Sequence, residues 1–333
     1  MSDAPFFIIG SERSGSNLLR LLLTTHSRLA VPHPPHLVHY FAPLQARYGD
    51  LAAAAPFHRL VADARRLLDR HIHPWDVVVD WARVEQEARP RDIFGIHDAV
   101  YAQYAAAKGK ARWGCKSTFM VHHVPTLHAN HPEARFLWLY RDPRDVAASS
   151  RASVFSPSHP VFAAELWRDQ QALARDAERR WPDCVYRVSY EELVRAPERV
   201  MEGVCAALGE AFEPPMLAYF ATGEAKRTAA LSESWSNVGS APTADRVGRA
   251  ASVLSAAEIT LVEAICAEGM SLLGYPTARS PAGRTFSSGE RARFRYEQAW
   301  MDVGIEWRSL RKDKNAARRW QRALWLCWLR ATR

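Results

Sequence analysis

A glycine loop between a short apolar run and a helical pattern is the feature that most restricts the fold of this chain. Residues 6–9 are apolar and predict a buried strand. Gly10 and Gly15 follow with four residues between them, and NLLRLLLTTH from residue 17 onward has helical periodicity. A strand, a glycine-rich turn and a helix in this order are typical of loops that hold a phosphate-like anion on backbone N–H groups. The sequence therefore predicts an anion site directly after its first strand.

The loop lacks the residues that bind a nucleoside triphosphate together with Mg²⁺. In ATP-binding loops a lysine follows the last glycine, and the next hydroxyl holds the metal. Here Ser16 and Asn17 occupy those two positions. Arg13 lies inside the loop instead, and its planar guanidinium matches the oxygens of a phosphate or a sulfate. The loop is suited to a nucleotide whose reactive end carries less charge than a triphosphate.

Two further strand-to-helix units follow the same pattern. Residues 134–140 predict a strand, followed by a helix with Asp142 as its N-cap and Pro143 at its first position. Residues 184–190 predict another strand, followed by a helical stretch over 191–209. This alternation predicts an α/β, P-loop-like fold of three layers, with helices on both faces of a mostly parallel sheet. Further helices are expected over 63–72, 93–108 and 256–273, and loops over 30–41 and 234–250.

The excess of positive charge is confined to the C-terminal part of the chain. The 333 residues carry a formal net charge of +8, and residues 281–333, with 13 basic and 5 acidic residues, account for all of it. We expect an α/β domain over 1–280 and a basic, tryptophan-rich helical extension over 281–333, with linker composition over 276–289. Because the main domain is neutral, no nucleic-acid partner is expected.

Cysteine usage and hydropathy indicate a reduced, cytoplasmic protein. The five cysteines are far apart and form no C-x-x-C pair, unlike the usual zinc and disulfide frameworks. The first residues lack the pattern of a signal peptide, and no stretch approaches the roughly 18 apolar residues of a membrane span. Histidines cluster around residues 26–39 and 122–131, but without thiols or a helical pair of ligands, so no metal is expected.

Two motifs together resemble those of the sulfotransferases that use 3′-phosphoadenosine 5′-phosphosulfate (PAPS). ERSGSN at 12–17 is similar to the first motif of that family, with Glu12 where proline is usual. RDPRDVAAS at 141–149 resembles the second motif throughout. Each motif follows a predicted strand, so the pair is much more specific than the glycine spacing alone. The resemblance implies PAPS as the sulfuryl donor, with no metal requirement.

The resemblance also implies a set of cofactor-binding residues. Arg141 and Ser149 would bind the 3′-phosphate, Arg141 through a charge-assisted hydrogen bond. Tyr190 matches a position that stacks near adenine, although core packing is the commoner role of such a tyrosine. The full expected set is Arg13, Ser14, Gly15, Ser16 and Asn17 in the loop, then Arg141, Ser149 and Tyr190, and finally Arg246, Gly248 and Arg249, which resemble a late loop that closes on the 3′-phosphate.

Sulfuryl transfer needs alignment, and positive charge where the leaving group accumulates negative charge. We expect Arg13 and Lys116 to supply that charge, because Lys116 lies where the family often has a lysine near the transferred group. A general base at the acceptor adds a factor of about 10² to 10⁴. His36 is the first candidate because imidazole titrates near physiological pH. His33 is the second and Glu12 the third, since the stretch around these histidines lacks the glutamate of microbial members.

The basic extension contains a predicted amphipathic helix. Its apolar stripe is surrounded by arginines and consists of Ala317, Trp320, Leu324, Cys327 and Trp328. Such a helix most often docks on its own domain or on a second subunit, as in a homo-oligomer. Alternatively, residues 314–333 lie on an anionic membrane surface. RNA binding is a distant third interpretation.

These features together predict a PAPS-dependent sulfotransferase. It would act on a hydroxyl group of a carbohydrate, lipid or small metabolite. An amine of such a molecule is the second choice of acceptor. Two alternatives stay open at this stage. A nucleotide kinase with a degenerate loop would turn over ATP with Mg²⁺, and a non-catalytic module would keep the fold while its basic tail binds a membrane surface. The acceptor is set by the shape of the pocket, which a list of residues does not reveal.

Overall fold

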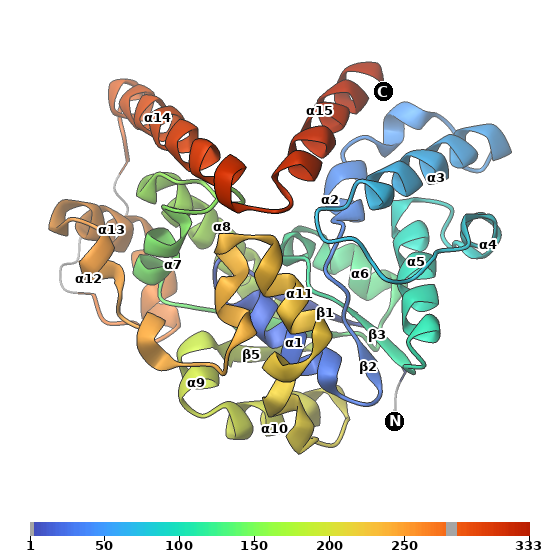
Figure 1. Ribbon diagram of the computed structural model, residues 1–333, viewed down its shortest axis with the longest axis horizontal. Coiled ribbons are helices and arrows are strands. Elements are labelled where there is room, and N and C mark those ends of the chain that lie inside the picture. The colour runs from blue at the N-terminus through green and yellow to red at the C-terminus, as the bar shows by residue number, and fades with distance from the viewer. Residues whose placement is uncertain (1–2, 278–284) are drawn as a thin grey trace.

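A parallel sheet of five strands forms the centre of the molecule. The structure is a computed structural model that describes residues 3–277 and 285–333. Helices cover both faces of the sheet, which confirms the predicted α/β fold with three layers (Figure 1). In spatial order the strands are β2 (Leu29–Ala30), β3 (Arg112–Cys115), β1 (Phe6–Gly10), β4 (Arg135–Tyr140) and β5 (Val185–Ser189), and all neighbouring pairs are parallel.

Both faces of strand β1 are buried. The side chains of Phe7 and Ile9 pack into a core cluster with helix α5 (Ile93–Ala107), and the alternate side chains of the strand pack into a second cluster with α1 (Ser16–Thr25). Burial on both faces explains why the strand is an unbroken apolar run and not an alternating pattern. The glycine loop is therefore anchored to the most deeply buried strand of the sheet.

The order of the strands brings functional loops together. Strand β1 lies between β3 and β4, and the chain builds the β2–β3 side of the sheet before it crosses to the β4–β5 side. Because all strands run in the same direction, the loops that follow β1, β3, β4 and β5 leave the sheet at one edge. Ligands of open parallel sheets bind where the strand order reverses in this way.

Most helices agree with the sequence patterns. Asp142 caps helix α7 (Pro143–Ser150), because its side chain accepts a hydrogen bond of 2.9 Å from the backbone N–H of Arg144. The helices predicted over 93–108 and 256–273 are α5 and α13 (Ala256–Leu272). The remaining helices of the main domain are α3 (Ala54–Asp69), α4 (Trp81–Glu87), α6 (Val124–Asn130), α8 (Pro160–Arg180), α11 (Gly223–Leu231), α12 (Ala250–Val253) and the 3₁₀ turns η1 (Gln45–Tyr48), η2 (Thr118–His123), η3 (Pro182–Cys184) and η4 (Pro214–Ala221).

The stretch predicted as one helix over 191–209 is two helices. They are α9 (Tyr190–Arg195) and α10 (Pro197–Leu208), and Ala196 between them has a non-helical backbone. Pro197 causes the break, since its ring disfavours the helical conformation of the preceding residue and it cannot donate a backbone hydrogen bond. The prediction of a continuous helix was therefore wrong at this proline.

Two segments predicted as loops contain short helices. The stretch 30–41 ends in α2 (Leu37–Phe41), and the stretch 234–250 contains the 3₁₀ turns η5 (Glu233–Gly239) and η6 (Ala244–Arg246). Buried side chains hold both segments against the body, since Leu37 and Val238 belong to core clusters. Packing against the main domain, which local sequence does not encode, explains these differences.

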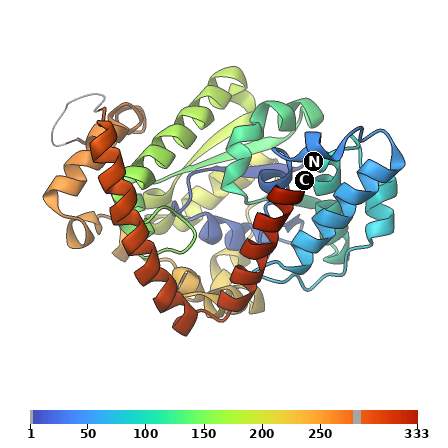
Figure 2. The ribbon, with the colours of Figure 1, turned by 90° about the horizontal axis from the view of Figure 1, so that it is seen from above.

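Two helices at the C-terminus form a V along one side of the molecule (Figures 1 and 2). They are α14 (Ser288–Lys312) and α15 (Ala316–Thr332). Helix α15 packs on the main domain through Leu326 and Leu329, so the predicted apolar stripe on its other side faces solvent. Residues 278–284, which include the expected domain boundary, lie outside the described residues. No described helix is both long and apolar enough to span a membrane.

Candidate active site

A pocket of about 580 Å³ lies at the edge of the sheet where the strands end. Lys116 directly follows β3, Arg141 follows β4 and Tyr190 follows β5, so three predicted residues reach the pocket from the ends of three parallel strands. The predicted residues that line it are Glu12, Arg13, Gly15, Ser16, Asn17, His33, His36, Lys116, Arg141, Ser149, Tyr190, Arg246 and Arg249. The structure thus brings both sequence motifs and the late loop to one cavity.

Two predicted residues do not line this pocket. Ser14 is completely buried, and its hydroxyl lies 2.7 Å from that of Ser11, so its side chain stabilises the turn of the loop. Gly248 donates its backbone N–H to the carboxylate of Asp145 at 2.7 Å. Both residues support the shape of the pocket.

The glycine loop requires both of its glycines. A Cβ on Gly10 would lie 2.0 Å from the carbonyl oxygen of Leu139, and a Cβ on Gly15 would lie 2.4 Å from the ring of Tyr190. Both glycines have positive φ angles, which other residues rarely adopt. Arg13 also has a positive φ of 64°, a strained conformation for a residue with a side chain, and such strain is concentrated at functional sites.

Arginines from three segments meet at one end of the pocket. Arg13 donates from Nε to the hydroxyl of Ser149 at 3.2 Å, and Arg141 donates from Nη1 to the carbonyl oxygen of Arg13 at 3.2 Å. Arg141 also lies 4.3 Å above the ring centre of Tyr190 and donates to the carbonyl oxygen of Arg246. The buried Nε of Arg141 has no hydrogen-bond partner. Placing several cations side by side in a buried site costs free energy unless an anion binds between them.

Asp145 holds the late loop against helix α7. Its carboxylate accepts hydrogen bonds from the backbone N–H groups of Gly248 at 2.7 Å and Ala250 at 2.9 Å, and it lies 3.6 Å from Arg141. The carboxylate is almost completely buried. Asp145 thereby positions Arg246 at the pocket. Sequence reasoning missed this role, because the two segments are far apart in the chain.

Glu12 and Lys116 both line the pocket and interact electrostatically as an ionisable pair. Burial raises the pKa of Glu12 to about 7, against the opposing effects of Lys116 and Arg13. Burial lowers the pKa of Lys116 to about 7, and Arg20 lowers it further. Arg13 is also affected, because burial lowers its pKa to about 10. Both members of the pair therefore exchange protons near neutral pH, which is typical of functional sites.

The two histidine candidates lie in different surroundings. The Nδ1 of His36 lies 2.8 Å from the hydroxyl of Ser117, and the imidazole lines the pocket beside Phe119. The Nδ1 of His33 lies 3.2 Å from Nε2 of His71. Burial keeps the pKa of both His33 and His36 well below the ordinary value, so both rings are neutral at pH 7. Only in His36 does Nδ1 contact a hydroxyl that can orient the ring.

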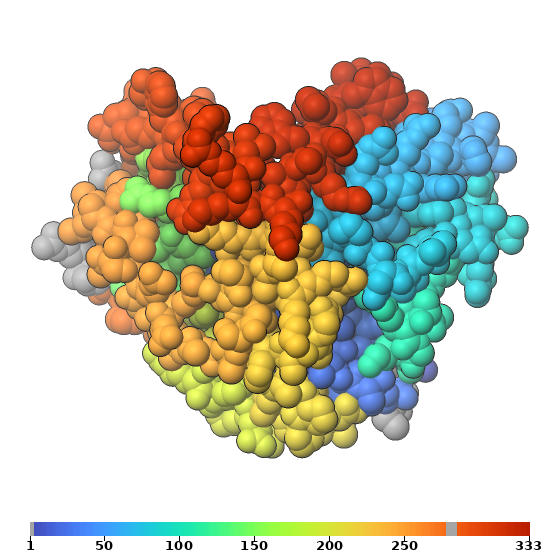
Figure 3. Space-filling view, in the orientation of Figure 1, coloured from blue at the N-terminus to red at the C-terminus, as the bar shows by residue number. Residues whose placement is uncertain are grey.

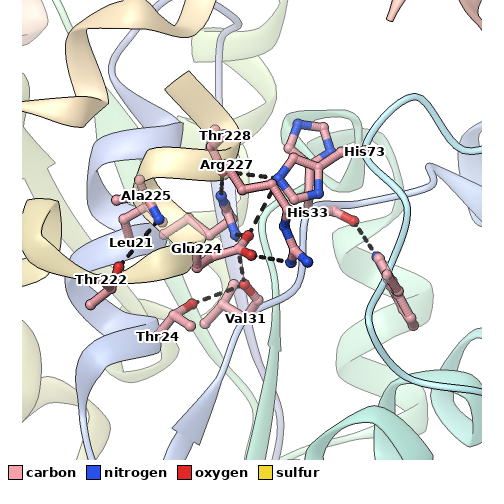
Figure 4. A network of polar contacts seen from close by, with 12 residues as sticks. Leu21, Thr24, Val31, His33, His73, Thr222, Glu224, Ala225, Arg227 and Thr228 are labelled. Atoms are coloured by element: carbon pink, nitrogen blue, oxygen red, sulfur yellow. Dashed lines mark hydrogen bonds and ion pairs between the residues drawn. The ribbon is translucent and has the colours of Figure 1, made fainter. Parts of the chain in front are cut away.

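A network of buried hydrogen bonds and ion pairs stabilises the part of the pocket wall that contains His33 (Figure 4). Arg20 of α1 donates to Glu224 at 2.8 Å and to Thr228 at 3.0 Å, both on α11. His73 lies 2.9 Å from the hydroxyl of Thr228 and stacks on His33, with ring centres 4.9 Å apart. The network joins α1 to α11 and explains why His33 is held in place. The described residues contain no cluster that could hold a metal ion.

The sequence reasoning missed several residues that line the pocket. Phe155 and Trp235 stack with their ring centres 5.0 Å apart, and Tyr40 and Phe119 add further aromatic surface. Arg322, from the C-terminal helix α15, lines the same pocket. No local pattern in the sequence indicated such an aromatic wall. Nothing in the local sequence distinguishes Arg322 from the other arginines of its helix.

The chain resembles known proteins in both sequence and fold. A sequence model described as sulfotransferase family matches residues 5–214. The nodulation protein NoeE of Sinorhizobium fredii is 27% identical over 227 residues, which is 61% of this chain and 49% of that protein. An uncharacterized protein of Aquifex aeolicus is 24% identical over 245 residues, which is 70% of this chain and 29% of that protein. The chain thus spans half or less of the length of these curated relatives.

Solved structures show the same fold. The sulfotransferase domain of the Synechococcus PCC 7002 olefin synthase is similar with a TM-score of 0.53 and 20% identity, over 82% of this chain and 95% of that domain. The sulfotransferase domain of the curacin biosynthetic pathway also has a TM-score of 0.53, with 17% identity, over 83% of this chain and 99% of that domain. The family model, which covers more than half of the chain, and this shared fold agree with the pocket described above, and the chain belongs to the sulfotransferase family.

Proposed function

We propose that this protein transfers a sulfuryl group from PAPS to a hydroxyl group of a small molecule, glycan or lipid. The observation that carries this proposal is the meeting of Arg13, Arg141 and Arg246 with Ser149 at the end of the glycine loop. This cluster offers charge-assisted hydrogen bonds to a phosphate that is separate from the anion held by the loop. A donor with two separate anionic groups, such as PAPS, fits that arrangement.

The residues of the site divide between two ends of the donor. Arg141, Ser149 and the late-loop residues Arg246 and Arg249 would hold the 3′-phosphate. The backbone N–H groups at the start of α1 would hold the 5′ end, since a helix N-terminus favours anions. The buried Nε of Arg141, which lacks a hydrogen-bond partner in the part of the chain that the structure describes, supports this assignment. The ring of Tyr190 offers a flat surface beside it for the adenine.

The protein contributes alignment, charge and proton transfer to the reaction. Bound PAPS supplies the sulfuryl group, whose bond to a phosphate oxygen breaks as a bond to the acceptor oxygen forms. Lys116 and Arg13 lie where positive charge can stabilise the oxygen that is left behind. His36 accepts the proton of the acceptor hydroxyl, while Ser117 orients its ring. Glu12 is the second candidate for the base, because its pKa of about 7 is well matched to such a role.

A nucleotide kinase is the second enzymatic candidate, and one experiment separates the two. The experiment is calorimetric titration of the protein with 3′-phosphoadenosine 5′-phosphate (PAP), ADP and AMP without metal, and with ATP and Mg²⁺. We expect PAP to bind at least tenfold more tightly than ADP or AMP, and Arg141→Ala to abolish the difference. The exposed Arg83, which pairs with Glu87, supplies the control Arg83→Ala. Tighter binding of ATP with Mg²⁺ would favour the kinase.

Two further proposals concern the cellular location and the assembly of the protein. All five cysteines are free, and three of them are buried. Free cysteines support a reducing compartment such as the cytoplasm. A homo-oligomer is compatible with this reaction.

A further inference from the structure

Helix α15 inserts one arginine into the wall of the pocket. Arg322 is only 5% exposed, although it belongs to a helix whose other arginines lie on the surface or pair with carboxylates. Its Nη2 donates to the carbonyl oxygen of Pro35 at 3.1 Å, and its guanidinium lies 4.9 Å from the ring centre of Tyr40. The buried Nε of Arg322 has no hydrogen-bond partner among the described residues. Arg322 therefore retains donor capacity inside the pocket.

No carboxylate of the described residues neutralises Arg322. Burial lowers its pKa, and only the phenol of Tyr40 opposes this effect. A buried charge without a partner costs several kcal/mol, so proteins keep one mainly where it has a ligand.

Arg322 lies at the end of the pocket where we place the acceptor. Its contact is the backbone of Pro35, next to the candidate base His36. After burial, the charge of Arg322 is the largest cause of the low pKa of His36. An anion bound to Arg322 would shield this charge and make His36 a stronger base. An acidic group on the acceptor would then have two effects: it would bind Arg322, and it would make His36, which deprotonates the acceptor hydroxyl, a stronger base.

We propose that Arg322 binds an acidic group of the acceptor, a carboxylate, phosphate or sulfate ester, close to the hydroxyl that receives the sulfuryl group. This inference rests on the proposed function and deepens it, because it assigns the acceptor to the class of hydroxylated acids. The C-terminal extension is then part of the active site.

The test compares two small probes that differ in one charge. Protein saturated with PAP is titrated by calorimetry with 4-hydroxybenzoate and with 4-hydroxybenzyl alcohol. We expect the acid to bind at least tenfold more tightly than the alcohol. Arg322→Gln should remove this preference, Arg322→Lys should retain part of it, and the exposed Arg318→Gln on the same helix should leave it unchanged. The affinity for PAP should be the same in all four proteins.

Failure of this inference is distinguishable from failure of the proposed function. If PAP binds but the acid has no advantage in the unaltered protein, or if Arg322→Gln keeps the advantage, the acidic-acceptor inference is wrong. If the unaltered protein does not bind PAP, the proposed function fails. Circular dichroism of Arg322→Gln and Arg322→Lys shows whether a change in binding follows from misfolding.

A second and independent observation concerns the outer face of the C-terminal helices. Large apolar side chains of α14 and α15 are between 44% and 65% exposed. On α14 they recur every three or four residues and so form one stripe. The apolar outer face consists of Tyr296, Trp300, Val303, Trp307 and Leu310 on α14 and of Trp320, Leu324 and Trp328 on α15. Figure 3 shows the two helices as ridges with a hollow between them.

The acidic and basic side chains of α14 and α15 differ in their surroundings. Three acidic residues of α14 have partners within the molecule. Glu297 lies 3.0 Å from His159 and Asp302 accepts a hydrogen bond from Ser158, both on the main domain, and Glu306 pairs with Arg319 of α15. Helix α15 contains no acidic residue. The charged residues of the two helices that are exposed as whole residues are all basic, namely Arg293, Arg295, Arg308, Arg311, Lys312, Arg318 and Arg330. The one acidic side chain beside them that is 44% exposed, Glu297, lies 3.5 Å from Arg293. The outer face is thus apolar and cationic.

We infer that the apolar outer face binds the surface of an anionic lipid bilayer. Tryptophan and arginine side chains are favoured at the boundary between headgroups and acyl chains, and basic residues are attracted to an anionic surface. A second copy of the chain fits less well, because it would bring the same cations against these cations. The charge of the surface therefore selects lipid over self-association.

Sedimentation with lipid vesicles tests the outer face. We expect binding to vesicles of phosphatidylcholine with 30% phosphatidylserine, and at least tenfold weaker binding to vesicles of phosphatidylcholine alone. The double change Trp300→Ser and Trp307→Ser should reduce binding at least tenfold. Val78→Ser, which alters an exposed apolar residue elsewhere, is the control. The inference is overturned if anionic vesicles are not bound, or if light scattering shows a dimer that the double change disrupts.

Discussion

Arg13 donates from its Nε to the hydroxyl of Ser149 at 3.2 Å, which joins the glycine loop to helix α7. The two residues belong to the two motifs by which the sequence resembles sulfotransferases, and 136 positions separate them. Their contact means that one ligand can reach both motifs. The bond also restrains Arg13, whose backbone has the positive φ of 64°.

The contact between Gly15 and Tyr190 predicts a binding defect for Gly15→Ala. The new Cβ would lie 2.4 Å from the ring, so the loop or the ring must move. We expect at least a tenfold loss of PAP affinity by calorimetry and a loss of stability of about 1 to 3 kcal/mol. Gly49→Ala is a matched control, since Gly49 has nearly the same φ of 91° but no atom within 4 Å of its Cβ position. Equal effects of both changes would contradict the role of the ring contact.

Removal of the proposed base should separate turnover from binding. We expect His36→Ala to reduce kcat by about 10² to 10⁴ while the Kd for PAP changes by less than about threefold, because the imidazole acts on the acceptor. Production of PAP from PAPS, with and without acceptor, measures the turnover. His58→Ala, which removes an exposed histidine paired with Glu85, is the control. If Glu12→Gln instead shows this pattern and His36→Ala does not, Glu12 is the base.

The buried pair of Glu12 and Lys116 should produce a minimum of stability near pH 7. Burial raises the pKa of Glu12 to about 7, so the folded state binds more protons than the unfolded state between about pH 4.5 and 7, and stability falls as pH rises. Burial lowers the pKa of Lys116 to about 7, so the folded state binds fewer protons from about pH 7 to 10.5, and stability rises with pH. Each of the two groups changes the free energy of unfolding by at most about 1.4 kcal/mol per pH unit.

Urea unfolding at several pH values measures this dependence. The double change Glu12→Gln and Lys116→Met should remove the minimum, whereas Glu268→Gln, which alters an exposed carboxylate, should leave it. Lys116→Met alone should stabilise the protein most below pH 7, where the buried ammonium is charged. A pH profile that is the same in the double variant would show that the pair does not titrate in this range.

Loss of the Asp145 carboxylate should release the late loop. Asp145→Ala removes the acceptor of the Gly248 and Ala250 amides, so hydrogen exchange at those two amides should accelerate at least tenfold. Arg246 should then be held less well, and PAP affinity should fall by a comparable factor. Asp169→Ala, at an exposed aspartate paired with Arg168, is the control. Unchanged exchange at Gly248 would contradict the anchoring role.

The fold and the meeting of the two motifs at one pocket could be predicted because their signals are local. Lys116, Arg141 and Tyr190 each follow a strand directly, and parallel strands bring such positions to one edge. The cap by Asp142 and the glycine loop are likewise encoded within a few neighbouring residues. The break at Pro197 was also readable, because a proline restricts its predecessor, but the prediction did not use it.

The sequence by itself determined the α/β architecture, the glycine loop and the positions after the strands that line the pocket, since hydrophobic patterns and glycine or proline chemistry act over short distances. Only the tertiary structure decided the rest. It placed Arg322 against Pro35 across 287 positions, joined Arg20 to Glu224 across 204, and turned the apolar outer face of α15 to solvent. These contacts depend on which surfaces meet when the chain packs, and no local pattern records which partner a buried arginine finds.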